Sequence, residues 1–313
     1  ILPGTSIAWV HREVVARYAH VIEQAEALIR TAQQQLAGEG STPIAFNGAA
    51  FTRNSLAFGQ AKPVQPAAAS PVRATAVDGG YVLENSLVRV AINAQGLLTS
   101  AVDLATGRET IAAGQEANLL QLHQDFPNMW DAWDIDRFYR NTVTDLREVV
   151  AISADMTGGE YLGTNGGVLA APRAEVRVER VFSRSRIVQT ISLEPDSRTV
   201  LIRSEVEWQE SEKLLKQAFP LDLYAATVEA ETQYGFQSRP THVNTSWEAA
   251  KFEMSMHRFV LVQERGFGAA LINDSIYGHD VTRDVDDAGV RTTVRLSLLR
   301  APRFPDPYTD HGV

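Results

Sequence analysis

Hydrophobic residues recur at every second position through most of the chain from residue 81 onward. In the segment "LVRVAI", Val88, Val90 and Ile92 share one face of an extended strand, and Arg89 lies on the other face. Turn residues separate such segments at intervals of roughly 8 to 15 residues, and no helical pattern intervenes. The alternation returns in "AEVRVERVF", "RIVQTISLE", "TVLIRSEVEW", "ATVEAET", "RFVLVQE", "GAALIND" and "RTTVRLSLL". About a dozen strands without helices between them predict a mainly β, antiparallel sandwich rather than a βαβ fold.

One long helical pattern precedes these strands, in residues 6–37. Thr5 or Ser6 suits the start of this helix, and Gly38 suits a left-handed stop. At about 45 Å, an apolar stripe of this length normally lies against other helices. Either the helix packs along the β region, or it belongs to a helical bundle whose other members precede it; we favour the second. The stripe consists of Ile7, Val10, Val14, Tyr18, Val21, Ile22, Ala25, Leu28, Ile29 and Leu36.

Turn residues in "AGEGSTP" end the helix and begin a different region. Residues 43–80 predict short strands together with an Ala- and Pro-rich connection, "AKPVQPAAASPVRA", which is typical of a linker.

Composition excludes several classes of protein. The 313 residues carry a formal net charge of −9, which argues against a nucleic-acid surface, because phosphate binding depends on clustered Lys and Arg. No run of 18 or more apolar residues occurs, so we expect no conventional membrane span. The absence of cysteine excludes disulfides, thiolate nucleophiles and cysteine-type zinc sites, and it fits a cytoplasmic protein.

The segment "NMWDAWDIDRFYR", residues 128–140, concentrates aromatic and acidic side chains. If it is extended, Asp134 and Asp136 project to one side about 7 Å apart, a separation that would suit the two carboxylates of an inverting glycosidase. The sequence gives no reason for either carboxylate to have a raised pKa. A calcium loop of the EF-hand type is a poor match, because its central Gly and terminal Glu are missing. The dense positions are Trp130, Asp131, Trp133, Asp134 and Asp136.

Two interpretations of this segment stay open. In the first, the aspartates accept backbone N–H groups and pair with Arg137 or Arg140 in a tight turn, while the tryptophans pack. In the second, a tryptophan ring stacks on a sugar face and the aspartates accept hydroxyl groups. The sequence favours the first interpretation.

A second dense stretch, "YGFQSRPTHVNTSWEAAKFEMSMHRF", covers residues 234–259. Thr245 and Glu248 have the spacing of a capping box, which predicts a short helix in "SWEAAKFE". The two histidines of this stretch are fifteen residues apart without Asp or Glu at metal-ligand spacing, so we predict a structural loop and no metal site. The polar contacts it offers are Arg239, His242 and His257.

Four segments carry a resemblance to a known family. They are "NMWDAWDIDRFYR", "YGFQSRPTHVNTSWEAAKFE", "HRFVLVQERGFGAALINDSIYGHDV" and "LSLLRAPRFPDPYTDHG". In this order they resemble the C-terminal half of glycoside hydrolase family 38, the α-mannosidases, and most of all its bacterial and cytosolic-type branch. The opening "ILPGTSI" resembles the stretch that follows a His-Asp pair in that family. The resemblance extends through nearly all of the chain.

The resemblance implies an architecture in three parts. In the family, an α/β catalytic domain is followed by a three-helix bundle and then by β domains that end in a galactose-mutarotase-like supersandwich. Residues 1–40 then correspond to the last helix of the bundle domain, residues 41–80 to a small β subdomain and linker, and residues 81–313 to the supersandwich. We expect the chain to be truncated at both ends, with the catalytic domain preceding Ile1.

The resemblance also implies a chemistry that this chain does not carry by itself. Family members are zinc-dependent retaining mannosidases, and their zinc ligands, nucleophile and general acid belong to the catalytic domain. We therefore expect zinc in the full-length enzyme, no metal ligand or catalytic residue in this fragment, and no activity of the fragment alone.

The two dense stretches are expected to border the substrate site of the intact enzyme. The expected partners are mannosides or mannose-containing oligosaccharides and the chain's own N-terminal catalytic domain, with homo-oligomers as a further expectation. We expect a bacterial, cytoplasmic protein. The alternative is a non-catalytic module that binds carbohydrate or forms oligomers. The expected substrate-binding residues are Trp130, Asp131, Trp133, Asp134, Asp136, Arg239, His242 and Asn244.

Overall fold

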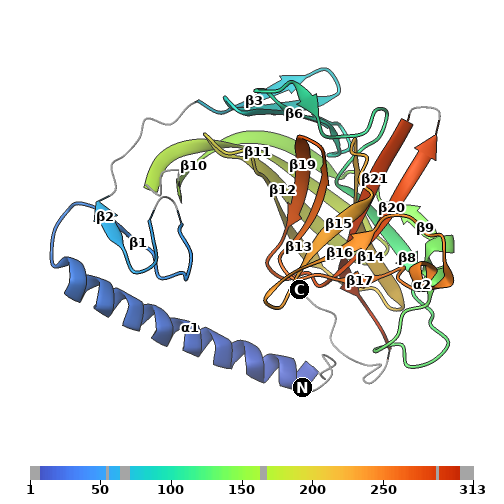
Figure 1. Cartoon of the computed structure of the whole chain (residues 1–313), viewed down its shortest axis with the longest axis horizontal. Helices are drawn as coiled ribbons and strands as arrows, with labels where there is room; N and C mark the ends of the chain where they lie inside the picture. The colour runs from blue at the N-terminus through green and yellow to red at the C-terminus, as the bar shows by residue number, and fades with distance from the viewer. Residues whose placement is uncertain (1–7, 54–55, 64–70, 163–167, 287–288, 304–313) are drawn as a thin grey trace.

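The computed structural model describes residues 8–53, 56–63, 71–162, 168–286 and 289–303 (Figure 1). One long helix comes first in the chain, and antiparallel sheets follow it. This arrangement confirms the mainly β, antiparallel fold that the period-two alternation predicts.

The long helix α1 (Ala8–Ala37) has 30 residues and agrees with the helical pattern in the sequence. Gly38 ends it in the left-handed region, with φ of +72°, and its N–H donates to the carbonyl oxygen of Gln34 at 2.8 Å. The expected caps Thr5 and Ser6 lie outside the described residues.

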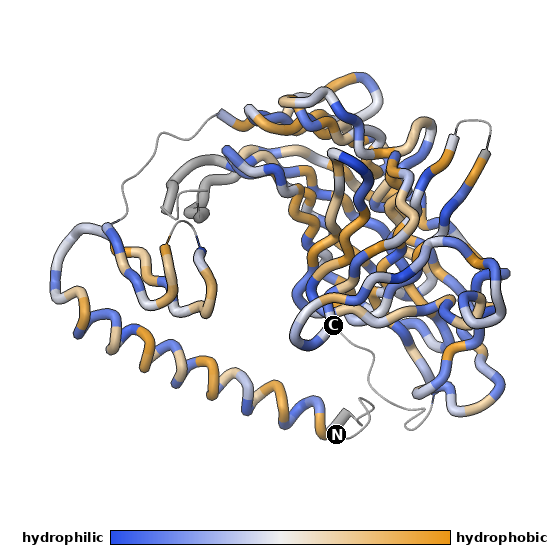
Figure 2. Tube along the Cα trace, in the orientation of Figure 1, coloured by the Kyte–Doolittle hydropathy of each residue, from blue (hydrophilic) through white to orange (hydrophobic). Residues whose placement is uncertain are grey.

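The apolar stripe of α1 is exposed to solvent. Figure 2 shows apolar and polar residues alternating along the helix, and Figure 1 shows the helix running apart from the stacked sheets. Within the described residues, no helix combines the length and the apolar character that a bilayer-crossing segment needs. The side chains more than half exposed include Tyr18, Val21, Ile22, Leu28, Ile29 and Leu36.

A small hairpin follows the helix. Its strands β1 (Ile44–Phe46) and β2 (Ala61–Pro63) are antiparallel. Buried Asn47 holds the loop between them, because its Nδ2 donates to the carbonyl oxygens of Phe51 and Leu56, both at 2.8 Å.

A five-stranded sheet pairs its strands in chain order, from β3 to β7. Because β3 pairs with β4, this sheet begins at Arg73. The sequence prediction placed the start of the large β region at residue 81. β3 is one of the short strands expected within residues 43–80, and it is exposed at four of its five positions. Residues 64–70 of the expected linker lie outside the described residues. The strands are β3 (Arg73–Val77), β4 (Gly80–Glu84), β5 (Val88–Asn93), β6 (Leu98–Asp103) and β7 (Arg108–Glu109).

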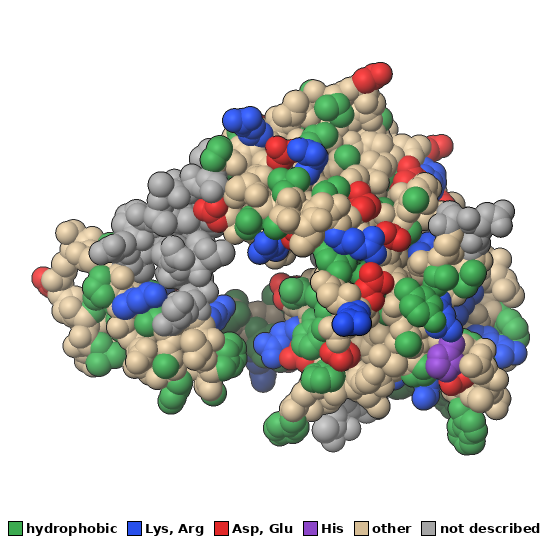
Figure 3. Space-filling model, turned by 45° about the horizontal axis from the view of Figure 1, so that its top comes forward, with side chains coloured by type: hydrophobic (Ala, Val, Ile, Leu, Met, Phe, Trp, Pro, Cys, Tyr) green, Lys and Arg blue, Asp and Glu red, His purple; other side chains and the backbone are tan. Residues whose placement is uncertain are grey.

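A second sheet contains four long strands. Along β11, Ala174, Val176 and Val178 are fully buried, whereas Arg177 on the opposite face pairs with Glu179, with 3.4 Å between Nη1 and Oε2. The alternation predicted for "AEVRVERVF" is confirmed here. Acidic and basic side chains are likewise interspersed over the face of the molecule in Figure 3. In spatial order the strands are β10 (Ala151–Leu162), β11 (Val168–Phe182), β12 (Ser185–Leu193) and β13 (Val200–Glu207).

The third sheet has six strands, and β14 lies inside it between β21 and β8. Every residue of β14 after Lys213 is buried, and most of this buried run is apolar. Lys216 interrupts that run, and its side chain is fully buried. In spatial order the strands are β17 (Met254–Ser255), β20 (Gly278–Asp286), β21 (Gly289–Arg300), β14 (Lys213–Leu221), β8 (Leu119–Gln124) and β9 (Val143–Asp145).

The fourth sheet has the order β16, β15, β18, β19. A short helix α2 (Ser246–Ala249) follows β16, and a 3-10 helix η1 (Arg137–Asn141) precedes β9. The strands are β15 (Thr227–Thr232), β16 (Gly235–Pro240), β18 (Phe259–Glu264) and β19 (Phe267–Ile272).

One apolar core joins the four larger sheets. It draws buried side chains from every one of them, so the sheets form a continuous β body. The loops that follow β8 and β16 are then held at its surface. The core includes Leu83, Val90, Ile92, Val176, Val178, Ile191, Phe219, Val294, Val228, Val260 and Val262.

Candidate functional site

The tryptophan loop, residues 128–136, is a turn and not a strand. Trp130 has a left-handed backbone with φ of +58°, and its carbonyl oxygen accepts the N–H groups of Trp133 and Asp134, both at 2.8 Å. The expectation that Asp134 and Asp136 project to one side of an extended chain is therefore wrong. Period-two geometry applies only to extended backbone, and this backbone is folded back on itself.

The aspartates of the loop hold its shape. Asp136 caps η1, because its Oδ1 accepts the N–H of Phe138 at 3.0 Å. Asp131 Oδ2 accepts the N–H of Arg303 at 2.7 Å, and Asp134 Oδ1 accepts the N–H of Ile135 at 2.9 Å. These contacts agree with the first interpretation in that the aspartates accept backbone N–H groups, whereas Arg140, one of the two arginines it named, pairs with Asp280.

A buried ion pair fastens the same loop to β21. The guanidinium of Arg300 donates to both carboxylate oxygens of Asp125 and also to the carbonyl oxygen of Asp134. Asp125 is buried, and the bidentate arrangement fixes the orientation of the arginine. The loop is therefore attached to a segment more than 160 residues away in the sequence.

The tryptophans of the loop are not packed inside the protein. Trp130 is 62% exposed and Trp133 is 47% exposed. Their rings meet edge to face, with 6.3 Å between centroids and 71° between planes. The first interpretation expected these rings to pack, and for the tryptophans it is wrong. The pair presents aromatic surface to solvent, which is the arrangement a sugar face would need.

The second dense stretch contains a capped helix, α2. Glu248 N–H donates to Thr245 Oγ1 at 3.3 Å, and Glu248 Oε2 accepts the N–H groups of Thr245 at 3.0 Å and of Asn244 at 2.6 Å. The predicted capping box is confirmed, although α2 ends at Ala249 instead of continuing through "AKFE". His242 Nε2 lies 3.2 Å from Glu248 Oε1. His242 and Asn244 therefore surround the start of α2.

Arg239 lies on β16 beside the buried imidazole of His279. Burial lowers the pKa of His279 to about 4, and the nearby charge of Arg239 adds to the effect. Burial also lowers the pKa of Arg239. His279 is neutral at pH 7, and Arg239 lies next to β20 instead of on the tryptophan loop.

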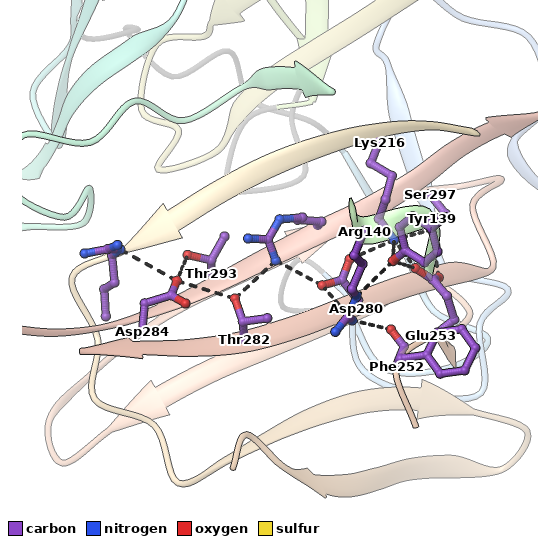
Figure 4. A network of polar contacts seen from close by, with 12 residues as sticks. Tyr139, Arg140, Lys216, Phe252, Glu253, Asp280, Thr282, Asp284, Thr293 and Ser297 are labelled. Carbon is purple, nitrogen blue, oxygen red and sulfur yellow. Dashed lines mark hydrogen bonds and ion pairs between the residues drawn. The ribbon is translucent and has the colours of Figure 1, made fainter. Parts of the chain in front are cut away.

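The two dense stretches of the sequence meet directly after the tryptophan loop. Tyr139 Oη donates to Glu253 Oε1 at 2.6 Å, and Arg140 Nη2 donates to the carbonyl oxygen of Phe252 (Figure 4). Arg140 Nη2 also lies 3.3 Å from Asp280 Oδ1. The segments around residues 139 and 253 are thus joined by Tyr139 and Glu253, which the sequence did not single out, and by Arg140, which it offered only as a partner of the loop aspartates.

Lys216 lies at the centre of this meeting point. Its Nζ pairs with Glu253 Oε1 and lies 2.7 Å from Asp280 Oδ2. It also donates to Ser297 Oγ at 2.9 Å and to Tyr139 Oη at 3.3 Å. Figure 4 shows these side chains converging from β14, β20, β21, η1 and the segment after α2. We call Tyr139, Arg140, Lys216, Glu253, Asp280 and Arg295 the buried ionic cluster.

Asp280 is ionised inside this cluster. Burial alone would raise its pKa, but the cations Lys216, Arg295 and Arg140 outweigh burial and lower it. Arg295 Nη1 lies 3.0 Å from Asp280 Oδ1, and the carboxylate is 1% exposed. An ionised group this deep in the protein is stable only while its partners remain, so the cluster locks η1 and the segment after α2 onto the third sheet.

A match to a family model decides the family. The model for the C-terminal domain of glycosyl hydrolases family 38 matches residues 83–308. The chain belongs to glycosyl hydrolase family 38. This confirms the resemblance carried by the four segments.

Curated proteins named as alpha-mannosidases are similar to this chain. Alpha-mannosidase 2C1 of Homo sapiens is 37% identical over 235 residues, which cover 75% of this chain and 21% of the human protein. An alpha-mannosidase of Saccharomyces cerevisiae is 27% identical over 324 residues, covering 100% of this chain and 28% of the yeast protein. The chain therefore spans less than a third of either relative.

A solved structure supports the fold of this family 38 chain. The crystal structure of an alpha-mannosidase from Enterococcus faecalis V583 matches with a TM-score of 0.57 at 16% identity, covering 79% of this chain and 29% of that one. At this identity the likeness concerns the fold alone.

Sequence reasoning about the family 38 chain missed the buried ionic cluster. Lys216 was the available indication, because a lysine within the apolar run "LLKQAFPL" must either break the strand or find buried partners. The partners Glu253 and Asp280 have no such mark. Among the described residues, no group of three or more His, Cys, Asp or Glu side chains is placed to hold a metal ion.

Proposed function

We propose that this chain is the β-rich C-terminal part of an α-mannosidase that hydrolyses terminal α-D-mannosyl residues. The observation that carries the proposal is the family 38 match over residues 83–308, together with the alpha-mannosidase names of the relatives. The substrates are then mannosides or mannose-containing oligosaccharides.

Zinc and the two carboxylates of a retaining mechanism are assigned in this proposal to a catalytic domain outside the chain. The residues described do not fit a zinc ion, because they bring together no set of three or more His, Cys, Asp or Glu side chains suited to a metal. In this proposal they supply no catalytic step, and the 313-residue chain is inactive by itself. The exposed stripe of α1 is the surface that the rest of the enzyme covers.

The role of the described residues in this proposal is to position the tryptophan loop at the border of the sugar site. The buried ionic cluster and the Arg300–Asp125 pair hold the loop from both ends. Trp130 and Trp133 remain exposed and offer ring faces to a sugar. Their exposure also favours a second candidate function, a non-catalytic carbohydrate-binding module.

An activity assay tests the proposal. The 313-residue chain should not hydrolyse 4-nitrophenyl α-D-mannoside, with or without added zinc. The same chain produced together with the segment encoded upstream of Ile1 should hydrolyse it, and a chelator should abolish that activity. Release of nitrophenol by the 313-residue chain alone, or activity of the longer protein that survives chelation, would contradict the proposal. An inactive longer protein that still binds mannosides would favour the binding module.

A further inference from the structure

A groove of about 420 Å³ lies at the tip of the hairpin that joins β15 and β16. The segment just before β18 forms its other side, and no part of the tryptophan loop contributes to it. Its volume is within the range of about 300 to 1,000 Å³ that is usual for small-molecule sites. We call it the hairpin groove. The lining residues that matter below are Glu231, Tyr234, Phe236, His257, Arg258 and Phe259.

Aromatic side chains form the apolar part of the hairpin groove. Tyr234 is the second residue of the two-residue turn between the strands, and its φ of +66° is a conformation that glycine adopts much more readily. The turn does have a glycine beside it, but this glycine lies one position later, at Gly235. The side chain of Tyr234 is fully exposed, and Phe236 is 60% exposed. An aromatic residue kept in a strained, solvent-exposed position has no packing role there, and strain of this kind concentrates at binding sites.

A fixed ion pair forms the polar part of the hairpin groove. Arg258 Nη2 donates to Glu231 Oε1 at 2.9 Å, and Arg258 Nε donates to Oε2 at 3.2 Å. The backbone N–H of Arg258 donates to the same Oε2 at 2.8 Å. These bonds use two of the five N–H donors of the guanidinium, and the Arg258 side chain is 76% exposed. A rigid, partly hydrated fork is thus presented to a ligand.

His257 completes one side of the hairpin groove and is held in place. Its backbone N–H donates to the carbonyl oxygen of Glu231 at 3.0 Å. Its ring meets Tyr277 edge to face, with 5.8 Å between centroids and 82° between planes. The hairpin groove is therefore largely formed before any ligand arrives, which reduces the entropy that binding must overcome.

We propose that the hairpin groove binds a hexopyranose ring of a neutral oligosaccharide. One ring face of the sugar contacts Tyr234 and Phe236, and its hydroxyl groups bond to Arg258 and Glu231. A sugar ring has an apolar C–H face and neighbouring hydroxyls, which match an aromatic side chain beside a planar donor–acceptor pair. The Glu231 carboxylate neutralises Arg258, so an anionic ligand is disfavoured. This site lies beyond the proposed hydrolysis, since it requires neither zinc nor a catalytic carboxylate.

Calorimetric titration of the 313-residue chain with an α-linked mannotriose, and with maltotriose for comparison, tests the proposal. At least one trisaccharide should bind, and Tyr234→Gly should weaken that binding by about tenfold. Because glycine suits the left-handed turn, Tyr234→Gly should unfold at the same temperature as the parent chain or higher, which separates lost binding from lost folding. Arg258→Met should also weaken binding.

Phe58→Ala is the matched control, because it removes an exposed aromatic side chain from the loop between β1 and β2 and leaves the hairpin groove intact. It should bind the trisaccharide as the parent chain does. The proposal is overturned if neither trisaccharide binds, if Tyr234→Gly binds normally, or if only Trp133→Ala abolishes binding, which would place the sugar on the tryptophan loop.

Discussion

The buried ionic cluster and the hairpin groove each contain an ion pair between a long cation and a glutamate, but the surroundings of the two pairs differ. Lys216 is fully buried and is enclosed by Glu253, Asp280 and two hydroxyl groups. Arg258 is 76% exposed and pairs with Glu231. The same kind of contact therefore lies in a low-dielectric interior in one region and in water in the other.

The surroundings of each ion pair determine whether it contributes to stability or to ligand binding. Inside the protein, both partners have lost their hydration, so each depends on the other and removing one leaves an uncompensated charge. At the surface, water and salt screen the attraction, and the pair adds little to stability. The exposed pair keeps hydrogen-bond donors and acceptors within reach of a ligand. In the buried pair, the donors and acceptors bond to other groups of the protein. Stability is expected to depend on the first region and recognition on the second.

The largest effect is expected from Lys216→Met. The change leaves Glu253 and Asp280 without their shared cation in a largely buried site, and it should lower the free energy of unfolding by about 3–5 kcal/mol. Urea unfolding at pH 7, followed by tryptophan fluorescence, measures the change. Lys251→Met, which removes an exposed lysine close to the same cluster, should stay within about 0.5 kcal/mol of the parent chain. Equal stabilities for both variants would show that the cluster does not hold the loops in place.

The next largest effect is expected from acid, because His279 takes up a proton more readily in the unfolded chain than in the folded chain. Its pKa is about 4 in the folded chain and about 6.5 when unfolded, so between these values the unfolded chain binds a proton that the folded chain does not. The free energy of unfolding should therefore fall as the pH drops from 6.5 to 4, by about 3 kcal/mol. The lowered pKa of Asp280 does not contribute in this window, because an ordinary aspartate is still ionised there.

Urea unfolding at a series of pH values measures this loss, and His279→Gln should remove most of it. An NMR titration of the parent chain supplies a check that does not depend on how the variant folds. An imidazole of His279 that titrates near its ordinary value would contradict the prediction.

The alternation in the sequence was enough to predict the β sheets, because the face of a strand that points into the core must be apolar whatever the order of the strands. Val88, Val90 and Ile92 are buried as their spacing predicts. The exposure of α1 could be expected only because no second long helical pattern follows it in the sequence. A stripe indicates that a helix has a face to bury, but it does not indicate whether the partner is in the same chain.

The candidate sites depend on contacts that no local pattern contains. The tryptophan loop turns back at Trp130, and its attachment comes from Arg300, far along the chain. Lys216 is an unusual residue for a buried strand, yet its partners Glu253 and Asp280 are ordinary acidic residues until the sheet order brings them together. The capping box at Thr245 was predictable, because both of its partners lie within one turn of the chain.

The smallest effect on stability is expected for the exposed pair of Arg258 and Glu231. A small effect there would support the contrast with the buried ionic cluster. Arg258→Met, Glu231→Gln and the double variant should have nearly the same urea midpoint as the parent chain. Any coupling between the two changes should vanish at about 1 M salt, where the screening length is about 3 Å. Glu231 also accepts the backbone N–H of Arg258, so Glu231→Gln keeps that bond and removes only the charge. A coupling that persists in high salt would mean that the hairpin groove contributes to stability as the buried ionic cluster does. The two regions would then not differ in their roles as expected.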